Sequence, residues 1–215
     1  MDGKHIPIKG KEYCEYLAID TKAGLVHRYL RQGHECAYGY WRLIGMLLEN
    51  GYEPYVVVSD GGPGIFSTLR RFNIIRHQRC HIHIMRDLRV GLRMHSRQMR
   101  IVLRKYYIYK YAQLVLKSIT NEQKENRLRH FYRVTNIMWS VSGDIERNTV
   151  KAFLKTLPVA FTWLEYEDVW NIPKTSNLVE GYISQINARL KTMRGLKNPA
   201  NAELLLNAIH YFLRR

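Results

Sequence analysis

A carboxylate beside a glycine-rich turn is the first feature of the sequence that could do chemistry. Asp60 follows the β-branched run Tyr55 to Val58 and precedes the turn Gly61-Gly62-Pro63-Gly64. Such a position lifts a carboxylate out of a sheet edge, and the glycines leave room for metal and phosphate beside the backbone. Aspartate also opens turns for structural reasons alone. The motif by itself therefore leaves a metal site and a structural turn equally open.

A glutamate near the start of a predicted helix is the second candidate. Glu180 stands three residues after Asn177, which is the spacing of a capping box. In that interpretation Glu180 only satisfies backbone donors at the helix start. Helical periodicity offers another interpretation, because it places Glu180 on a polar face with Ser184 and Asn187, opposite an apolar stripe. That face could look toward a metal or toward water.

Asp2 and the segment from Cys80 to His83 are weaker candidates on their own. Asp2, in Asp2-Gly3-Lys4, has the position of a frayed terminus. Cys80 and His83 could supply half of a zinc site, but zinc needs four ligands and no second pair has metal-ligand spacing. We therefore expect Cys80 to be a buried thiol at the end of a strand and His83 to pack or hydrogen-bond beside the site.

The composition favours a polyanionic partner. The chain has 215 residues, 46% of them hydrophobic, and its 34 Lys and Arg against 18 Asp and Glu give a net charge of +16. This charge makes nucleic acid the leading partner. No apolar run approaches the roughly 18 residues of a membrane-spanning helix, and the N-terminus lacks the apolar core of a signal peptide. The three widely spaced cysteines favour a reducing compartment, so we expect a cytoplasmic, nucleoid-associated protein without membrane contact.

These residues must be positioned by an α/β fold. Periodicity predicts strands over 13–19, 25–30, 55–58 and 77–82, with helices over 38–49 and 64–72. Strand signals end near His83, and helices follow over 99–119, 122–138 and 148–157. Two further helices are predicted over 177–193 and 201–215. We therefore divide the chain into an N-terminal part of the catalytic core (1–83), a helical insertion (84–172) and C-terminal helices that complete the core (173–215).

Aromatic residues in the insertion could contact nucleic acid or form its core. Four tyrosines between 106 and 111 are interleaved with Arg104, Lys105 and Lys110. We favour a helix with a buried aromatic face and a solvated charged face over base stacking. For Trp139 and Trp163 we likewise favour a core position over a role with an extruded base.

Four segments together resemble the catalytic domain of DDE transposases, specifically the mutator-like insertion-sequence group. The matching segments are Asp2-Gly3-Lys4, residues 57–61, residues 78–83 with Arg86-Asp87-Leu88, and residues 175–181 with the following 187–195. Each segment is weak alone, whereas all four in this order are specific. The resemblance implies an RNase H-like mixed sheet, with a mostly α-helical insertion between Asp60 and Glu180.

The resemblance also implies the chemistry of the site. It assigns catalysis and metal binding to three carboxylates, Asp2, Asp60 and Glu180, with two Mg²⁺ ions and Mn²⁺ as a substitute. Paired divalent ions stabilise the attacking and leaving oxygens of an in-line phosphoryl displacement. The partners would be transposon ends and target DNA, bound by a homo-oligomer. The preferred phosphate contacts are Arg189, Lys191 and Arg194, although an ordinary solvated helix face explains them equally well.

One departure concerns the first aspartate, which in this group should end a central strand. Only Met1 precedes Asp2, so we expect an N-terminally truncated domain whose first strand is missing, and a poorly soluble or oligomeric chain. Two outcomes stay open, an active enzyme for DNA cleavage and strand transfer and an inactive fragment. The alternatives are a non-catalytic nucleic-acid-binding protein and a nuclease with an RNase H-like fold.

Overall fold

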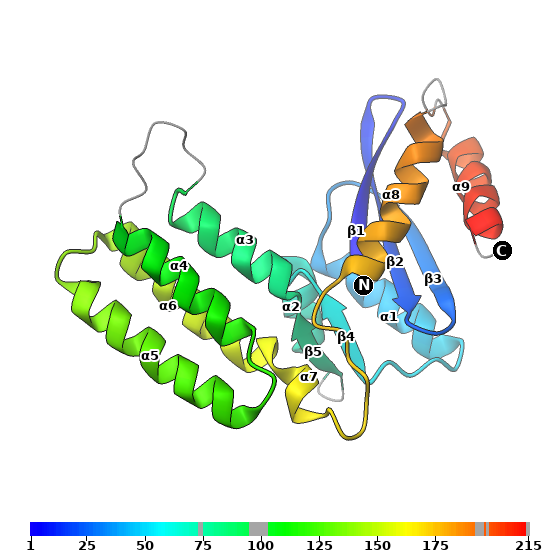
Figure 1. The fold of residues 1–215 in the computed structure, drawn as a ribbon. Helices are drawn as coiled ribbons and strands as arrows, with labels where there is room; N and C mark the ends of the chain where they lie inside the picture. Colours follow the sequence, from blue (N-terminus) through cyan, green and yellow to red (C-terminus); the bar gives the residue numbers. More distant parts are fainter. Residues whose placement is uncertain (73–74, 95–102, 192–195, 197, 214–215) are drawn as a thin grey trace. The chain divides into compact units, whose positions relative to one another are not determined.

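The computed structural model describes residues 1–72, 75–94, 103–191, 196 and 198–213. The chain divides into two compact units. The first unit comprises Met1–His77 and Ser176–Arg215, and the second comprises Gln78–Thr175. Figure 1 shows that the first unit contains a sheet with helices, whereas the second is built mainly of helices. The mixed α/β class predicted from the sequence is thereby confirmed.

Three antiparallel strands form the main sheet of the first unit, in the order β1-β2-β3. They are β1 (Asp2–Ile8), β2 (Lys11–Asp20) and β3 (Gly24–Gln32). In the turn between β1 and β2, Lys9 and Gly10 have φ values of 48° and 72°. Positive φ at both central residues is what a tight two-residue hairpin requires. The hairpin sets the register in which Asp2 pairs with Leu17.

The sequence patterns predicted no strand over residues 2–8, whereas in the structure β1 begins at Asp2, so the first aspartate starts a strand instead of ending one. From His5 onward the strand alternates between exposed and buried side chains, and Ile6 and Ile8 are 2% and 0% exposed. Lys4 and Pro7 hide this pattern in the sequence, because lysine is seldom buried and proline is depleted in strands. The expected poor solubility or oligomerisation of the chain stays a prediction.

Alternate side chains of β2 serve two separate cores. Cys14, Tyr16 and Ala18 pack with residues of α1 (Ala37–Glu49). On the other face, Leu17 packs with residues of β1, α8 (Asn177–Lys191) and α9 (Pro199–Leu213). Helices therefore cover both faces of the sheet (Figure 1).

A second, smaller parallel sheet contains β4 (Val56–Ser59) and β5 (Arg76–Arg79), with α2 (Pro63–Leu69) between them in the chain. The backbone nitrogen of Met1 donates a 2.9 Å hydrogen bond to the carbonyl oxygen of Val58. The start of β1 therefore lies beside β4, which brings Asp2 and the end of β4 to the same edge.

The second unit holds α3 (His81–Gly91), α4 (Leu103–Leu116), α5 (Asn121–Trp139), α6 (Asp144–Ala160) and α7 (Thr162–Glu165). Helix α5 begins with a cap, because the hydroxyl of Thr120 accepts a hydrogen bond of 3.1 Å from the backbone nitrogen of Gln123. Phe131 of α5 packs on Phe153 of α6, with ring centroids 5.2 Å apart. The region predicted as a helical insertion, 84–172, lies within this unit.

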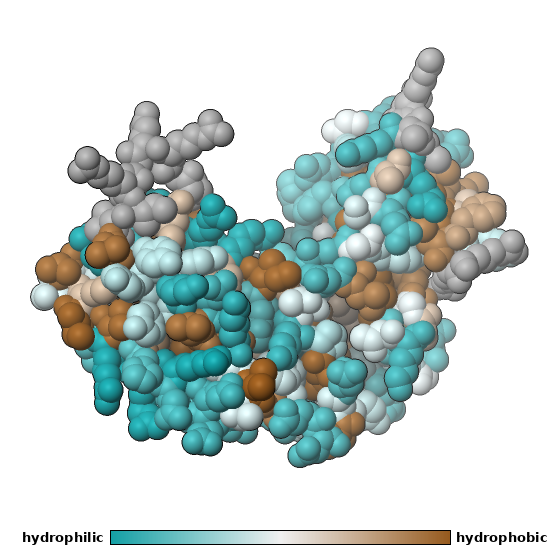
Figure 2. Space-filling view, in the orientation of Figure 1, coloured by the Kyte–Doolittle hydropathy of each residue, from teal (hydrophilic) through white to brown (hydrophobic). Residues whose placement is uncertain are grey.

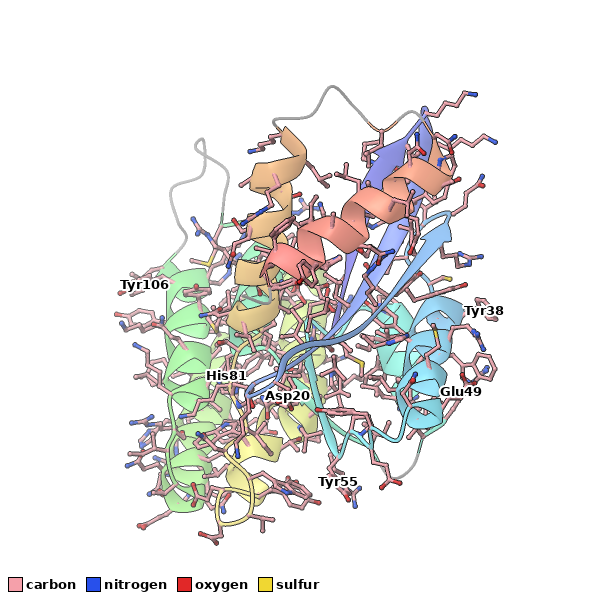
Figure 3. All side chains as sticks on the ribbon, turned by 90° about the vertical axis from the view of Figure 1, so that its right-hand side faces the viewer. Asp20, Tyr38, Glu49, Tyr55, His81 and Tyr106 are labelled. Atoms are coloured by element: carbon pink, nitrogen blue, oxygen red, sulfur yellow. The ribbon has the colours of Figure 1, made fainter. Side chains whose placement is uncertain are left out.

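Helix α4 buries a different face from the one predicted. Tyr106 and Tyr107 are 45% and 38% exposed, whereas Lys105 is 8% exposed. Figure 3 shows Tyr106 pointing away from α4. The reason is electrostatic: Nε of Arg104 lies 2.8 Å and Nζ of Lys105 3.7 Å from the Glu146 carboxylate. This ion pair holds the basic side of the helix against α6. The predicted helix began at residue 99, and 99–102 fall outside the described residues.

Among the described residues, no helix combines the length and the apolar character needed to cross a bilayer. The face drawn in Figure 2 is mostly hydrophilic, with hydrophobic side chains gathered over α9. On α9, Leu204 and Phe212 are 68% and 63% exposed.

Candidate active site

Asp2 occupies the first position of β1, on the strand face that also carries Lys4 and Ile6. Its Oδ1 accepts a hydrogen bond of 2.8 Å from the backbone nitrogen of Gly3. Burial raises the pKa of Asp2 to about 6, and the hydrogen bond from Gly3 opposes this while the negative charge of Asp60 adds to it. Protonation or a bound cation would therefore stabilise the Asp2 side chain.

Asp60 directly follows β4, as the sequence predicted. Its Oδ1 accepts a hydrogen bond of 2.9 Å from the backbone nitrogen of Gly62. Gly61 has a φ of 78°, a left-handed conformation that glycine adopts without strain. Ser59 also stabilises the turn, because its Oγ accepts a 3.1 Å hydrogen bond from the backbone nitrogen of Gly61. The same Oγ is hydrogen-bonded to Nε2 of His77 at 2.8 Å. These bonds hold the Asp60 carboxylate at the carboxyl end of the strand.

Glu180 lies in the first turn of α8. Its Oε1 accepts a hydrogen bond of 2.5 Å from the hydroxyl of Ser176, and Asn177 is the first helical residue rather than the cap. The predicted apolar stripe is buried at Val179 and Ile186, which are 4% and 0% exposed, and partly buried at Tyr182, Ile183 and Leu190, while Met193 lies outside the described residues. The polar face that carries Glu180 therefore lies on the side of α8 opposite Val179 and Ile186.

That polar face lines a cavity of about 390 Å³ together with Asp2. The lining residues are Asp2, Gly3, Lys4, His5, Glu180, Ile183, Ser184 and Asn187. Two of the three predicted carboxylates thus share one cavity. The third, Asp60, is close enough for its charge to raise the pKa of Asp2.

Lys4 lines this cavity and is buried. The side chain is 7% exposed, and its ammonium donates a hydrogen bond to Oδ1 of Asn187. Burial lowers the pKa of Lys4, and the negative charge of Glu15 opposes that shift. Glu15 is itself fully buried, with Arg28 3.0 Å and Nε2 of His210 2.8 Å from its Oε1.

Glu35 is a carboxylate that the sequence analysis missed. It immediately precedes the N-cap of α1, and the buried hydroxyl of Tyr40 donates a 2.6 Å hydrogen bond to its Oε1. A Cβ added at Gly3 would lie 2.9 Å from Cδ of Glu35, and one added at Gly62 would lie 3.8 Å from its Oε1. Glu35 therefore lies beside the chain segments that carry Asp2 and Asp60. No motif or spacing in the sequence marks it.

Cys80 and His83 belong to the second unit. Cys80 is fully buried and directly follows strand β5. The strand is shorter than the predicted 77–82, because β5 ends at Arg79 and helix α3 begins at His81. His83 lies within α3 and is 8% exposed. Their support of the site stays a prediction.

The predicted DNA contacts lie toward the end of α8. Arg189 and Lys191 are exposed, and Nη1 of Arg189 donates to the carbonyl oxygen of Gln185 at 3.2 Å. Arg194 lies outside the described residues.

Trp139 and Trp163, two of the three tryptophans of the second unit, differ in their surroundings. Trp163 is 8% exposed, as expected for a core residue, and Nζ of Lys174 lies 3.6 Å from its ring centroid. Trp139 is half-buried at the end of α5 beneath the Arg147 guanidinium. Neither is an exposed platform for a base.

The donor set of the site suits a hard divalent cation. Asp2, Asp60 and Glu180 offer carboxylate oxygens, the ligands that Mg²⁺ and Mn²⁺ prefer over thiolate or imidazole. Burial is the main cause of the raised pKa of Asp2, and the negative charges of Asp60 and Glu35 add to it. A bound cation would offset both effects.

Comparison with protein families matches residues 32–212 to the family described as "Transposase, Mutator family". Asp60, Glu180 and Glu35 lie inside the matched region, and Asp2 lies outside it. A comparison with curated proteins found no match.

Proposed function

The chain belongs to the Mutator family of transposases, and we propose that it cuts and joins DNA by metal-dependent phosphoryl transfer at Asp2, Asp60 and Glu180. One observation carries the assignment of the site. Asp2 shares a cavity with Glu180 and feels the charge of Asp60, although the three residues are far apart in the sequence. The role of Asp2 rests on this geometry, because the family match begins at residue 32.

Asp2, Asp60 and Glu180 would hold two Mg²⁺ or Mn²⁺ ions. When bound, such ions neutralise charge on the attacking and leaving oxygens of an in-line displacement. The chain contributes by fixing its carboxylates in advance. Asp2 is held by Gly3, Asp60 by Gly62 and Glu180 by Ser176, so little reorganisation is needed when the ions bind.

The strand arrangement supports an RNase H-like sheet for the first unit. The bond between Met1 and Val58 places β1 beside β4, and β4 pairs with β5. With the order β1-β2-β3, the combined order is β3-β2-β1-β4-β5. The two aspartates then follow or begin adjacent central strands, where a ligand can reach both.

The basic excess supports DNA as the partner. A net charge of +16 favours a polyanion, and the exposed Arg189 and Lys191 lie on the same helix as Glu180. In this proposal the full-length chain binds transposon ends and target DNA as a homo-oligomer, in the cytoplasm with the nucleoid.

The test is nicking and joining of plasmid DNA by the purified full-length chain with Mg²⁺ or Mn²⁺. Asp60→Asn and Glu180→Gln should reduce both reactions to the level without protein, because each removes a metal-binding oxygen anion. Glu49→Gln is the matched control, since Glu49 is an exposed carboxylate at the end of α1 (Figure 3).

Full activity in EDTA, or in both variants, would contradict the proposal. Salt-sensitive DNA binding without any metal-dependent reaction would instead identify a non-catalytic binding protein. Cleavage without joining would identify a nuclease.

A further inference from the structure

Lys4 is a buried cation at the candidate site. It occupies a position of β1 between Asp2 and Ile6 on the same face. Its neighbours along that face toward the hairpin, Ile6 and Ile8, are core residues. An apolar side chain would satisfy packing at this position without the cost of burying an ammonium group.

The surroundings of Lys4 only partly compensate its charge. An ammonium group has three donors, and Asn187 is a neutral acceptor for one of them. The negative charge of Glu15 also acts on Lys4, but the Glu15 carboxylate already bonds to Arg28 and His210. Among the described residues that line the cavity, Lys4 is the sole lysine or arginine.

The same cavity contains Asp2 and Glu180. A phosphodiester that approaches these carboxylates is repelled by both. A lysine ammonium acts as a compact point charge for phosphate, and its attraction is stronger where water is partly excluded. The cavity therefore pairs two anionic side chains with one cation that an anion can reach.

We propose that Lys4 binds a non-bridging oxygen of a DNA phosphodiester that enters this cavity, and that Asn187 holds the ammonium in place for it. This inference rests on the proposed function, because it takes DNA as the substrate. It goes beyond that function by assigning a phosphate contact at the carboxylates themselves, separate from Arg189 and Lys191.

The experiment measures binding of a fluorescently labelled DNA duplex to the full-length chain by anisotropy. Ca²⁺ replaces Mg²⁺ so that binding can be followed without turnover. Lys4→Met keeps the length of the side chain and removes its charge in a buried place, which favours folding. We expect it to raise the Kd about tenfold and to reduce the slope of log K against log salt concentration by about 1.

Two further variants separate a phosphate contact from a general loss of charge. Lys11→Met removes an exposed lysine at the start of β2, and we expect its Kd to stay within about twofold of the wild type, as for a lysine that contacts no phosphate. Asn187→Ala keeps the cation but removes its acceptor, and we expect a smaller loss than Lys4→Met causes. Circular dichroism establishes that each variant is folded.

An unchanged Kd and salt slope for folded Lys4→Met would overturn the inference, as would an equal loss in Lys11→Met. If Lys4→Met failed to fold, Asn187→Ala would decide, and wild-type affinity in that variant would overturn the inference. Absence of DNA binding by the wild-type chain would overturn the proposed function together with the inference. The two failures are thus distinguishable.

Discussion

The hydroxyl of Tyr40 donates a 2.6 Å hydrogen bond to Oε1 of Glu35, and this bond holds the Glu35 carboxylate beside the segments that carry Asp2 and Asp60. Tyr40 is fully buried, and burial together with the charges of Glu35, Asp2 and Asp60 raises the pKa of its hydroxyl. The hydroxyl therefore stays protonated and keeps donating at any pH at which the protein is folded.

Glu35→Gln should weaken the binding of Mn²⁺ several-fold, because a negative charge near the site is lost. The amide keeps the size of the side chain and an acceptor for Tyr40. Titration of free Mn²⁺ by electron paramagnetic resonance, without DNA, measures the affinity directly. Glu49→Gln should leave the affinity unchanged, and equal affinities of the wild type and Glu35→Gln would show that Glu35 does not act on the ions.

The metal-free protein should lose stability as the pH rises from about 4 to about 6. Burial raises the pKa of Asp2 from 3.8 to about 6, so between these values the folded state holds a proton that the unfolded state has released. The free energy of unfolding then falls with increasing pH. Asp2→Asn removes this dependence, and the difference between the two proteins in urea denaturation at pH 4 and pH 6.5 measures it. A constant difference would contradict the assignment.

Local patterns in the sequence predicted the parts of the site that depend on neighbours in the chain. Asp60 follows its strand because a β-branched run meets a glycine-rich turn, and both features act locally. The polar face of α8 follows from helical periodicity, which needs only the sequence of that helix. In the structure Glu180 lines a cavity together with Asp2, and its role as a metal ligand stays a prediction.

Contacts between distant residues account for what the sequence did not reveal. The buried ammonium of Lys4 donates a hydrogen bond to Asn187 of α8, and the buried Lys105 pairs with Glu146 of α6. Glu35 lies at the site because Tyr40 and the close passage of Gly3 place it there. No local propensity encodes such pairings, since they form only after the elements have packed.

Glu146→Gln should destabilise the second unit by about 1–2 kcal/mol at neutral pH, because hydrogen bonds to charged groups contribute about that much at a partly exposed partner. Burial alone would raise the pKa of Glu146, but the hydrogen bond and charge of Arg104 and the charge of Lys105 outweigh it and lower the pKa. The pair therefore stabilises above the ordinary pKa of 4.5, and the contribution is lost as the pH falls through the lowered value.

Urea denaturation at pH 7 and at pH 3 measures this difference. The matched control is Glu125→Gln, since the Glu125 side chain is 62% exposed and lies 3.9 Å from Lys124. We expect that control to change stability by less than about 0.5 kcal/mol. A Glu146→Gln effect as small as the control would mean that the Arg104 pair contributes nothing to stability.

Gly39→Ala should destabilise the first unit by about 3 kcal/mol or more, because helix α1 and strand β2 touch at this residue. An added Cβ would lie 1.9 Å from Cζ and 2.4 Å from the hydroxyl oxygen of Tyr16. Tyr16 is fully buried, and its hydroxyl oxygen accepts a 2.9 Å hydrogen bond from the backbone nitrogen of Cys36. The ring cannot withdraw without losing that bond, so the overpacking must be absorbed by moving the helix.

Gly45 on the same helix provides the control, because an added Cβ there meets no atom within 4 Å among the described residues. Gly45→Ala should stabilise by about 0.5–1 kcal/mol, since alanine restricts the unfolded chain and favours the helix. The midpoints of urea denaturation should thus move in opposite directions for the two variants. If Gly39→Ala were as stable as Gly45→Ala, the Tyr16 ring would not lie against α1. The position of Glu35, which directly precedes the α1 cap, would then have to be revised as well.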